Sequence, residues 1–450
     1  MTDLLSKYDT AVPRYTSYPT VPYWEPETIN TEKWKNSVSK MFIKEEGELC
    51  IYIHLPFCES LCTFCACNKR ITKNHKVEEP YISALLKEWA IYKSLLTSKP
   101  KIKEIHLGGG TPTFFSPTNL ALLIHEITKD SIISENHEFS IEVHPNFTTE
   151  QHLITLGNIG FNRISVGVQD FDFEVQFAIN RVQSYEKTKE VIDWARKAGF
   201  ESVNIDLVYG LPKQTVKNIE YTISHMATLK PERIAFYSYA HVPWKSKGQR
   251  RYTEADLPTS SDKWKMYHRG KELLEQQSFA SIGMDHFALP TDKLWQAASK
   301  GKMHRNFMGY TTTNSKLIIG LGASAISDSW NAFIQNEKEV EKYQEKIEAG
   351  ELPIMTGHVL NDEDLLLRKL ILDLMCIGKT EVINSGLDEV FLREAFQKLQ
   401  QLEEDDLVTV KSNTISVTVK GAIFIRNICA SLDARLWRSG SGQKVFSKAI

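Results

Sequence analysis

Four cysteines lie within ten residues near the start of the chain. Cys58, Cys62 and Cys65 form a C-x3-C-x2-C triplet, Cys67 follows two residues later, and the whole chain has seven cysteines. Cysteines this close rarely form unstrained disulfides, and a 450-residue chain with so few is not a disulfide scaffold. Zinc remains an alternative, although its sites usually combine two well-separated pairs. The spacing favours an iron–sulfur cluster held by three thiolates, with one iron left open for a substrate or cofactor.

The sequence around the triplet resembles a known signature. C-x3-C-x2-C after the short apolar segment Y-I-H-L-P-F (52–57) is similar to the motif of radical S-adenosylmethionine enzymes. In that superfamily, the three cysteines hold a [4Fe-4S] cluster, and S-adenosylmethionine chelates the fourth iron. The longer string, which ends in C-A-C-N, resembles oxygen-independent coproporphyrinogen III oxidases, as do R-Y-T-S-Y-P-T (14–20) and K-G-A-I-F-I-R-N-I-C (420–429). The resemblance covers nearly the whole chain.

This resemblance implies an oxidoreductase of porphyrin and haem biosynthesis. The reduced cluster would split S-adenosylmethionine, and the resulting 5'-deoxyadenosyl radical would take a hydrogen from the β-carbon of a propionate. Loss of CO2 and one electron leaves a vinyl group, and two such events convert coproporphyrinogen III to protoporphyrinogen IX. The family pattern implies two S-adenosylmethionine molecules per active site, together with an electron donor and an electron acceptor that the sequence does not identify.

The resemblance also assigns residues to the cofactors. Cys58, Cys62 and Cys65 would be the cluster ligands. Cofactor contacts are expected at Tyr52, Phe64, Gly109, Gly110, Thr111, Glu142, Gln169, Arg181, Asp206, Ala240 and Ile326. Carboxylates in this set can accept hydrogen bonds from ribose hydroxyls and an ammonium group, and an arginine can pair with a carboxylate. For any one polar residue taken alone, loop capping is the alternative.

We assign Cys67, Tyr52 and His54 to catalysis. Only one residue separates Cys67 from Cys65, so sharing a cubane would be strained; we therefore interpret Cys67 as a functional thiol that does not bind the cluster. A replacement ligand or a bystander thiol is the alternative. A lone histidine is more often a hydrogen-bonded packing residue, and this alternative applies to His54 as it does to His241, His286 and His304.

Cationic side chains are required because the implied substrate carries four propionates. The candidates are Arg14, Arg250, Arg251 and Arg305. Arg14 and Tyr18 belong to the R-Y-T-S-Y-P-T arm, which in the family resembles a segment that closes over the active site; an arm laid on the surface is the alternative.

Two motifs depart from the family pattern. Met308 stands in H-R-N-F-M-G-Y-T-T where glutamine is expected, and E-V-H-P-N (142–146) replaces E-V-D-P-R at His144 and Asn146. Both changes bear on the second S-adenosylmethionine, whereas the site of the first is untouched.

Short apolar runs alternate with helical patterns through the middle of the chain and predict what positions these residues. Strands are expected at 49–55, 102–107, 140–143, 163–168, 203–208 and 233–239, with helices between them. Most of the implied contact residues lie at or just beyond the carboxyl end of a strand, where parallel α/β folds place their active sites. The fold class is therefore α/β: a partial (β/α)6 radical-SAM barrel with extra strands, an N-terminal arm, and a mainly helical C-terminal domain with a small β-wing.

Three segments follow from this pattern: an arm at 1–45 that lies over the active site, the barrel at 46–350 and the winged helical domain at 355–450. Proline and aromatic residues in the arm argue against a helix core there. Further helices are expected from Glu79, after Thr215, at 260–277 and at 337–351, and extra strands between 255 and 350 are expected to close the open edge of the barrel.

Composition limits the other functions. The net charge is -2, 42% of residues are apolar and no run of about 18 apolar residues occurs. These values argue against nucleic-acid binding and membrane insertion. We expect a monomer in the cytoplasm, where thiols stay reduced. Two rivals remain: a haem-binding chaperone of the same superfamily, which typically lacks the fourth cysteine and the arm, and a regulator that senses through its cluster.

Overall fold

The structure is a computed structural model that describes residues 4, 7–382, 386–439 and 446. The remaining positions of the predicted arm and C-terminal domain (1–3, 5–6, 383–385, 440–445 and 447–450) lie outside the described residues.

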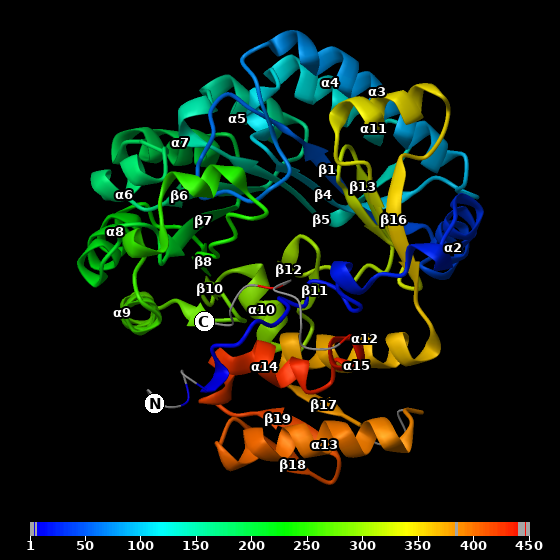
Figure 1. The fold of residues 1–450 in the computed structure, drawn as a ribbon. Helices are drawn as coiled ribbons and strands as arrows, with labels where there is room; N and C mark the ends of the chain where they lie inside the picture. The colour runs from blue at the N-terminus through cyan, green and yellow to red at the C-terminus, as the bar shows by residue number, and fades with distance from the viewer. Residues whose placement is uncertain (1–3, 5–6, 383–385, 440–445, 447–450) are drawn as a thin grey trace.

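A twelve-stranded sheet forms the centre of the molecule (Figure 1). Its middle consists of parallel strands in chain order: β1 (Glu48–Leu55), β4 (Lys101–Gly109), β5 (Ile132–Val143), β6 (Arg163–Gln169), β7 (Ser202–Tyr209) and β8 (Arg233–Ser238). The six predicted strands are confirmed. Only β5 differs much in length, because it begins eight residues earlier than its apolar run.

Six further strands lengthen the sheet at both edges. Beyond β1 lie β13 (Ile318–Leu321), β14 (Ile326–Asp328), β15 (Ala332–Asn336) and β16 (Ile354–Val359). Beyond β8 lie β10 (His286–Ala288) and β9 (Ala280–Ser281). Extra strands between 255 and 350 are thus confirmed. The helix expected at 337–351 is shorter, α11 (Val340–Glu348), because β15 extends to Asn336.

Helices cover the outer face of the parallel strands. They are α3 (Glu78–Lys93), α4 (Pro117–Thr128), α5 (Glu150–Asn158), α7 (Tyr185–Lys197), α8 (Val216–Thr228) and α9 (Ser260–Gln276). Two shorter helices, α6 (Phe173–Ala178) and α10 (Lys293–Ser299), pack in smaller hydrophobic clusters outside this layer. The helix predicted after Thr215 begins with a capping box between Thr215 and Asn218.

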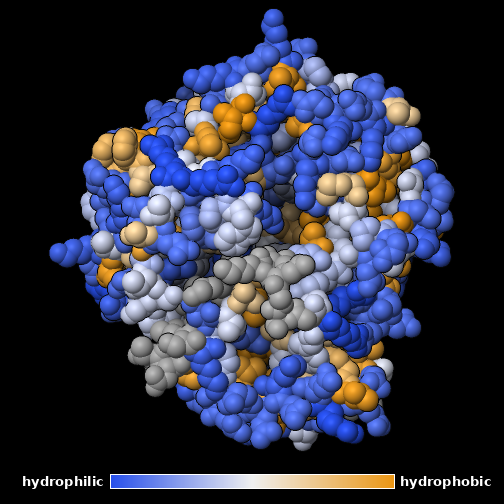
Figure 2. All heavy atoms as spheres, in the orientation of Figure 1, coloured by the Kyte–Doolittle hydropathy of each residue, from blue (hydrophilic) through white to orange (hydrophobic). Residues whose placement is uncertain are grey.

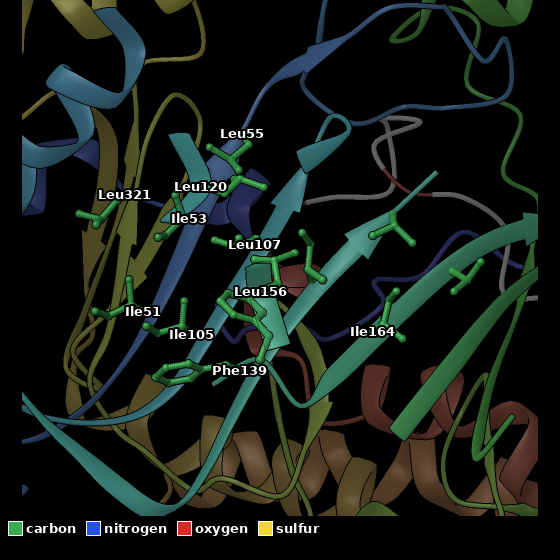
Figure 3. Packing of buried hydrophobic residues seen from close by; sticks show 14 of the residues in the cluster. Ile51, Ile53, Leu55, Ile105, Leu107, Leu120, Phe139, Leu156, Ile164 and Leu321 are labelled. Atoms are coloured by element: carbon green, nitrogen blue, oxygen red, sulfur yellow. The ribbon is translucent and has the colours of Figure 1, made fainter. Parts of the chain in front are cut away.

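The main core lies between this helical layer and the sheet. Figure 3 shows Ile51, Ile53 and Leu55 of β1 packed with Leu120 of α4 and other buried residues. Side chains alternate along a strand, so the residues between these, Tyr52 and His54, point to the opposite, inner face of the sheet. The core therefore fixes which side of β1 faces the inside of the partial barrel.

A helix that the composition argued against forms near the N-terminus. α2 (Thr31–Lys44) follows the proline-rich stretch, and Asn30 accepts a hydrogen bond from the N–H of Lys33 as its cap. Trp34, Val38 and Phe42 belong to the main core. The expectation that the first 45 residues lack a helix core is wrong, because prolines are confined to positions before residue 27 and the later residues have helical spacing.

The C-terminal elements pack around a second hydrophobic cluster. They are α12 (Asp362–Ile377), β17 (Lys379–Glu381), α13 (Glu389–Glu404), β18 (Val408–Lys411), β19 (Thr414–Val417), α14 (Ile425–Ala430) and α15 (Ala434–Arg438). The predicted wing is the β18–β19 hairpin, whose turn residues Ser412 and Asn413 have φ values of 48° and 63°. Tyr8, Tyr15 and Tyr18 of the arm join this cluster, so the arm is part of the C-terminal packing.

Two short two-stranded sheets complete the fold: β2 (Phe57–Cys58) with β3 (Arg70–Ile71), and β11 (His304–Asn306) with β12 (Gly309–Thr311). Over the part of the chain that the structure describes, no helix combines the length and apolar character needed to cross a membrane.

Candidate active site

The cysteine loop lies at the carboxyl end of β1. Parallel pairing of β2 with β3 closes the loop at its base. The thiols of Cys58, Cys62, Cys65 and Cys67 line one cavity together with the glycine turn after β4. The backbone N–H of Gly110 donates to the carbonyl of Leu55 at 2.8 Å, which joins the two strand ends directly. The sheet thus brings the triplet and the turn together, although about 45 residues separate them.

Two neighbouring segments support the loop from outside. At the end of α6, the N–H of Thr63 donates to the carbonyl of Ile179 at 2.9 Å. From the segment after β8, Ser246 Oγ donates to the carbonyl of Cys65 at 3.0 Å, and Gln249 Nε2 donates to the carbonyl of Phe64 at 2.7 Å. The thiols are therefore held by a backbone that is fixed on both sides.

Polar groups surround the thiols. Thr111 Oγ1 donates to Cys58 Sγ at 3.4 Å, and Arg181 Nη1 donates to Cys62 Sγ at 3.4 Å. Burial raises the pKa of Cys58 to about 11, so this thiol needs a bound metal to displace its proton. A hydrogen bond from Cys67 lowers the pKa of Cys65, and the same contact raises the pKa of Cys67. Donors at the sulfurs stabilise thiolates, which are the form that binds iron.

The arrangement of the thiols fits a cluster. Among the described residues, no group of three or more His, Cys, Asp or Glu side chains converges on a single-ion site. In a cubane each thiolate binds a different iron, so its ligands stand around a body instead of meeting at one point. Cys58, Cys62 and Cys65 line one cavity in this way.

The glycine turn packs too closely for any side chain. Gly109 has a φ of 113°, and a Cβ there would lie 2.6 Å from the His54 ring. A Cβ at Gly110 would lie 2.6 Å from the backbone of Pro56. Glycine is required at both positions, and the backbone of the turn faces the cavity.

Glu142, at the end of β5, faces the same cavity. Its carboxylate accepts hydrogen bonds from His106 Nε2 and from the N–H of Gly109, both at 3.3 Å. Burial works against ionisation of Glu142, but these two donors outweigh it and lower its pKa. The carboxylate is thus held ionised and aimed at a ligand.

Tyr52 and His54 form a hydrogen-bonded pair on the inner face of β1. His54 Nε2 donates to the carbonyl of Asn68 at 2.9 Å, which leaves Nδ1 to accept from the Tyr52 hydroxyl at 2.9 Å. Burial lowers the pKa of His54, so the imidazole is neutral. His54 therefore links β1 to the end of the cysteine loop.

Arg181 and Asp206 occupy the far wall of the cavity. Arg181 Nη2 donates to the carbonyl of Gly167 at 2.6 Å, whereas its buried Nε has no hydrogen-bond partner among the described residues. Asp206 accepts from Ser165 Oγ at 2.9 Å and from Asn204 Nδ2 at 2.8 Å. Burial and the charge of Glu142 raise the pKa of Asp206 to about 6. A buried, unused guanidinium N–H beside a cavity fits the carboxylate of an amino-acid group.

The other predicted contacts lie at different distances from this cavity. Phe64 and Gln169 line it, and Gln169 has a φ of 69° at a bulge between β6 and β7. Ala240 does not line it, but Gln249 donates to its carbonyl as well as to that of Phe64. Ile326 begins β14, beyond β13 at the other edge of the sheet, and packs with Trp24. The structure thus gathers most of the predicted set around the cavity, whereas Tyr52, Ala240 and Ile326 do not line it.

The candidate cations divide into two groups. Arg14 forms an ion pair with Asp285 at 3.2 Å, and Arg305 is buried and donates to the carbonyls of Tyr15 and Arg14, both at 3.3 Å. Arg250 and Arg251 are exposed on the segment outside the cysteine loop. Only Arg14 and Arg305 lie where the arm meets the barrel.

The candidate histidines and the departures from the family pattern have separate positions. His286 faces the Tyr237 hydroxyl at 3.4 Å, His241 faces the Tyr239 hydroxyl at 3.0 Å, and His304 is buried on β11. His144 lines the cavity, and burial next to Arg181 lowers its pKa to about 2. Asn146 donates to the carbonyl of Val182, and the Met308 N–H donates to Asn306.

Sequence reasoning missed His106, Ser165 and Asn204. Asn204 lies two residues before Asp206, His106 lies two residues before Gly108, which adjoins Gly109, and Ser165 lies four residues before Gln169. Extending the two-residue period backwards along each strand would have found them.

Comparisons with known proteins agree with this geometry. Residues 52–226 match the radical SAM superfamily. Oxygen-independent coproporphyrinogen III oxidase of Helicobacter pylori is 37% identical over 454 residues, which cover 99% of this chain and 98% of that protein. The protein of the same name from Escherichia coli is 36% identical over 452 residues, with 99% and 98% covered. A solved structure of coproporphyrinogen III oxidase from Escherichia coli, described as a radical SAM enzyme, matches with a TM-score of 0.88 at 35% identity and covers 94% of this chain and 100% of that one.

Proposed function

The chain belongs to the family of oxygen-independent coproporphyrinogen III oxidases, and from this premise we propose how its residues carry out the reaction. The enzyme is a radical SAM oxidoreductase that catalyses oxidative decarboxylation in haem biosynthesis. Two propionates of coproporphyrinogen III become vinyl groups in protoporphyrinogen IX.

One observation carries the proposal. The three thiols of the triplet, the glycine turn, the Glu142 carboxylate and the Arg181 side chain line one cavity at the carboxyl ends of the strands. When bound there, the [4Fe-4S] cluster and S-adenosylmethionine supply a reductively generated carbon radical that can abstract hydrogen from an unactivated carbon. Cys58, Cys62 and Cys65 would hold the cluster, and the glycine turn lines the same cavity.

The surrounding groups match the polar parts of S-adenosylmethionine. The backbone at Gly109, Gly110 and Thr111 takes its amino-acid end, and the ionised Glu142 accepts from an ammonium or hydroxyl group. Gln169, Arg181 and Asp206 form a second polar set on the opposite wall. We assign the second S-adenosylmethionine to this set, in which Arg181 would pair with its carboxylate.

The catalytic residues act by holding groups in place. Tyr52 and His54 fix the base of the loop through Asn68, and His54 acts there as a neutral imidazole. Cys67 is exposed in the cavity and donates a hydrogen bond to Cys65. We assign it no role as a cluster ligand, so its thiol can contact the substrate or the second cofactor.

Substrate carboxylates require cations on the side opposite the cysteines. Arg14 and Arg305 supply them from the arm and from β11. The pair formed by Arg14 and Asp285 shows that this guanidinium already binds a carboxylate in the protein. Arm closure would then exclude water from the reactive carbon.

The remaining partners are an electron donor and an electron acceptor. We propose that the enzyme is cytoplasmic, because all seven cysteines are free and the cluster needs reduced thiols. We also propose that it is a monomer. Cell fractionation tests the location of the enzyme, and sedimentation tests its oligomeric state.

Anaerobic reconstitution with iron and sulfide, followed by a product assay with coproporphyrinogen III, S-adenosylmethionine and dithionite, tests the function. We expect protoporphyrinogen IX, with 5'-deoxyadenosine formed in proportion. Stoichiometric haem binding without turnover would instead favour a haem chaperone, for which the relatives reported above give no support.

A further inference from the structure

An exposed surface outside the cysteine loop combines cations with aromatic side chains. We name it the outer basic surface and define it by Phe173, Phe177, Trp244, Lys245, Lys247, Arg250, Arg251 and Lys338. Nothing in the decarboxylation geometry uses these residues. Arg250 and Arg251 were sequence candidates for binding propionates, but they lie on this outer side, away from Arg14 and Arg305.

The charge of this surface differs from that of the whole chain. The chain has a net charge of -2, yet residues 245–251 (K-S-K-G-Q-R-R) contain four cations and no acid. In the part of the chain that the structure describes, none of these four cations lies within 4 Å of a carboxylate. The charge of Lys245, together with burial, lowers the pKa of Lys338. An ordinary solvated face would carry mixed or paired charges.

Aromatic side chains adjoin these cations. Phe173 is 58% exposed, Phe177 is 55% exposed and Trp244 is 58% exposed. The Arg251 guanidinium lies 6.0 Å from the centre of the Phe177 ring, which joins α6 to the cationic segment. In Figure 2, hydrophobic atoms border a strongly hydrophilic band at the upper left, where Figure 1 draws α6. Exposed aromatic residues with arginine are typical of protein interfaces.

The same segments are those that hold the cysteine loop. Ser246, between the two lysines, bonds to the carbonyl of Cys65, and the residues following Phe177 bond to Thr63 and Leu61. A partner seated on the outer basic surface would therefore be separated from the cluster ligands by little more than this loop. Electron transfer weakens steeply with distance, so a short path of this kind is what a redox partner needs.

We propose that the outer basic surface docks an acidic electron-carrier protein that reduces the cluster. The inference rests on the proposed function, because only a cluster-bearing enzyme needs such a donor. The reduced carrier is oxidised by one electron, which passes to the cluster, and no atom is transferred. Complementary charge steers association, and the three aromatic side chains supply the apolar contact.

The test uses reconstituted holoenzyme and a plant-type [2Fe-2S] ferredoxin as the acidic carrier. Stopped-flow absorbance would follow cluster reduction at several salt concentrations. The double variant K245E/K247E should slow reduction by ferredoxin at least about tenfold at low salt, and added salt should slow the parent enzyme. The variant Phe177→Ser should slow reduction by ferredoxin less than K245E/K247E does, and the effect of Phe177→Ser should be independent of salt.

Controls separate docking from other failures. K379E/K411E changes charge equally on the distant wing and should leave reduction by ferredoxin unchanged. Dithionite should reduce the cluster and drive decarboxylation equally in the parent enzyme and in K245E/K247E. If dithionite drives no decarboxylation in the parent enzyme, the proposed function fails, whereas reduction by ferredoxin can still be measured. The docking proposal is overturned if K245E/K247E is reduced at the parental rate, if the wing control slows equally, or if the surface binds a single-stranded oligonucleotide and not ferredoxin.

Discussion

The cofactor cavity and the arm seam use polar side chains in opposite ways. We define the arm seam by Tyr8, Val12, Pro13 and Tyr15 of the arm, Arg426 and Asn427 of α14, and Asp433. In the cavity, Arg181 Nε lacks a hydrogen-bond partner within the described residues, and Glu142 and the thiols face open space. In the seam, the donors are already used. Arg426 Nε donates to the carbonyl of Pro13 at 3.0 Å, and Asn427 donates to the carbonyl of Tyr8 at 3.0 Å.

This contrast separates binding from stability. A side chain with unused hydrogen-bonding capacity contributes little until a ligand arrives, so its removal should weaken binding and spare the fold. A side chain that satisfies buried backbone carbonyls leaves them unpaired when it is removed, at about 1–3 kcal/mol each. Variants of the two regions should therefore fail in different measurements.

The largest effect is expected for Cys62→Ala. Loss of one of three thiolates should abolish both the iron–sulfur absorption and turnover, whereas the thermal midpoint of the cluster-free protein should stay the same. Iron and sulfide analysis would measure the cluster content, a product assay the turnover, and calorimetry the thermal midpoint. Cys376→Ala, remote from the cavity and packed beside the second hydrophobic cluster, is the control that should keep its cluster. A full cluster in Cys62→Ala would show that Cys67 can act as a ligand.

Arg426→Met should have the opposite profile. The carbonyls of Val12 and Pro13 would lose their donor, so we expect the thermal midpoint to fall and a protease to cut the arm sooner, with the cluster content unchanged. Arg438→Met removes an arginine of α15 that forms an ion pair with Glu363 and has a side chain that is 60% exposed, and it should cost under about 1 kcal/mol. Equal protease resistance in Arg426→Met and the parent enzyme would contradict a role of this arginine in fixing the arm.

Arg181→Gln should give a smaller loss confined to binding. A charge-assisted hydrogen bond contributes about 1.5–3 kcal/mol, so the affinity for S-adenosylmethionine should fall roughly 10- to 100-fold. The carbonyl of Gly167 keeps a second donor, Gln183 Nε2 at 3.1 Å, so the thermal midpoint should change little. Equilibrium dialysis of the reconstituted protein measures the affinity. Arg196→Gln on the outer helix α7 is the matched control, and an equal loss of affinity there would count against the cavity assignment.

The two regions also differ in how far the sequence predicts them. The cavity groups follow local rules: cysteine spacing predicts the cluster ligands, and Glu142 and Asp206 lie in the carboxyl-terminal halves of two apolar runs. The contacts of the arm seam follow no local rule, because Arg426 and the arm carbonyls that it contacts are more than 400 residues apart. An arginine bonded to backbone carbonyls leaves no pattern in either segment.

Two local misreadings have physical causes as well. Proline content near the start hid α2, although Trp34, Val38 and Phe42 have helical spacing. The first six residues of β5 are mostly exposed and polar, so no apolar run marked them as strand. Ile132 and Ile133 pair with β4, whereas the next four residues lie in an irregularity of that ladder. Such pairing is a tertiary property that one segment does not encode.

Asp433→Asn should leave binding and turnover unchanged and alter only the pH dependence of stability at the seam. Burial raises the pKa of Asp433 to about 6, and Tyr15, Tyr18, Cys429 and Arg435 face it. Because the folded protein favours the protonated acid, the stabilisation is complete below about pH 4 and is lost as the pH rises to about 6, at a total of roughly 3 kcal/mol.

The amide in Asp433→Asn can still accept from the Leu436 N–H and can donate to the Tyr15 hydroxyl, so both hydrogen bonds of the parent survive. The unfolding midpoint of Asp433→Asn should therefore exceed that of the parent at pH 7.5 and approach it near pH 4. Asp388→Asn, at the exposed cap of α13, should leave the slope of stability against pH unchanged. Affinity for S-adenosylmethionine should not differ between the parent and Asp433→Asn at either pH. If it did, the seam and the cavity would be coupled, and the separation of stability from binding would not hold.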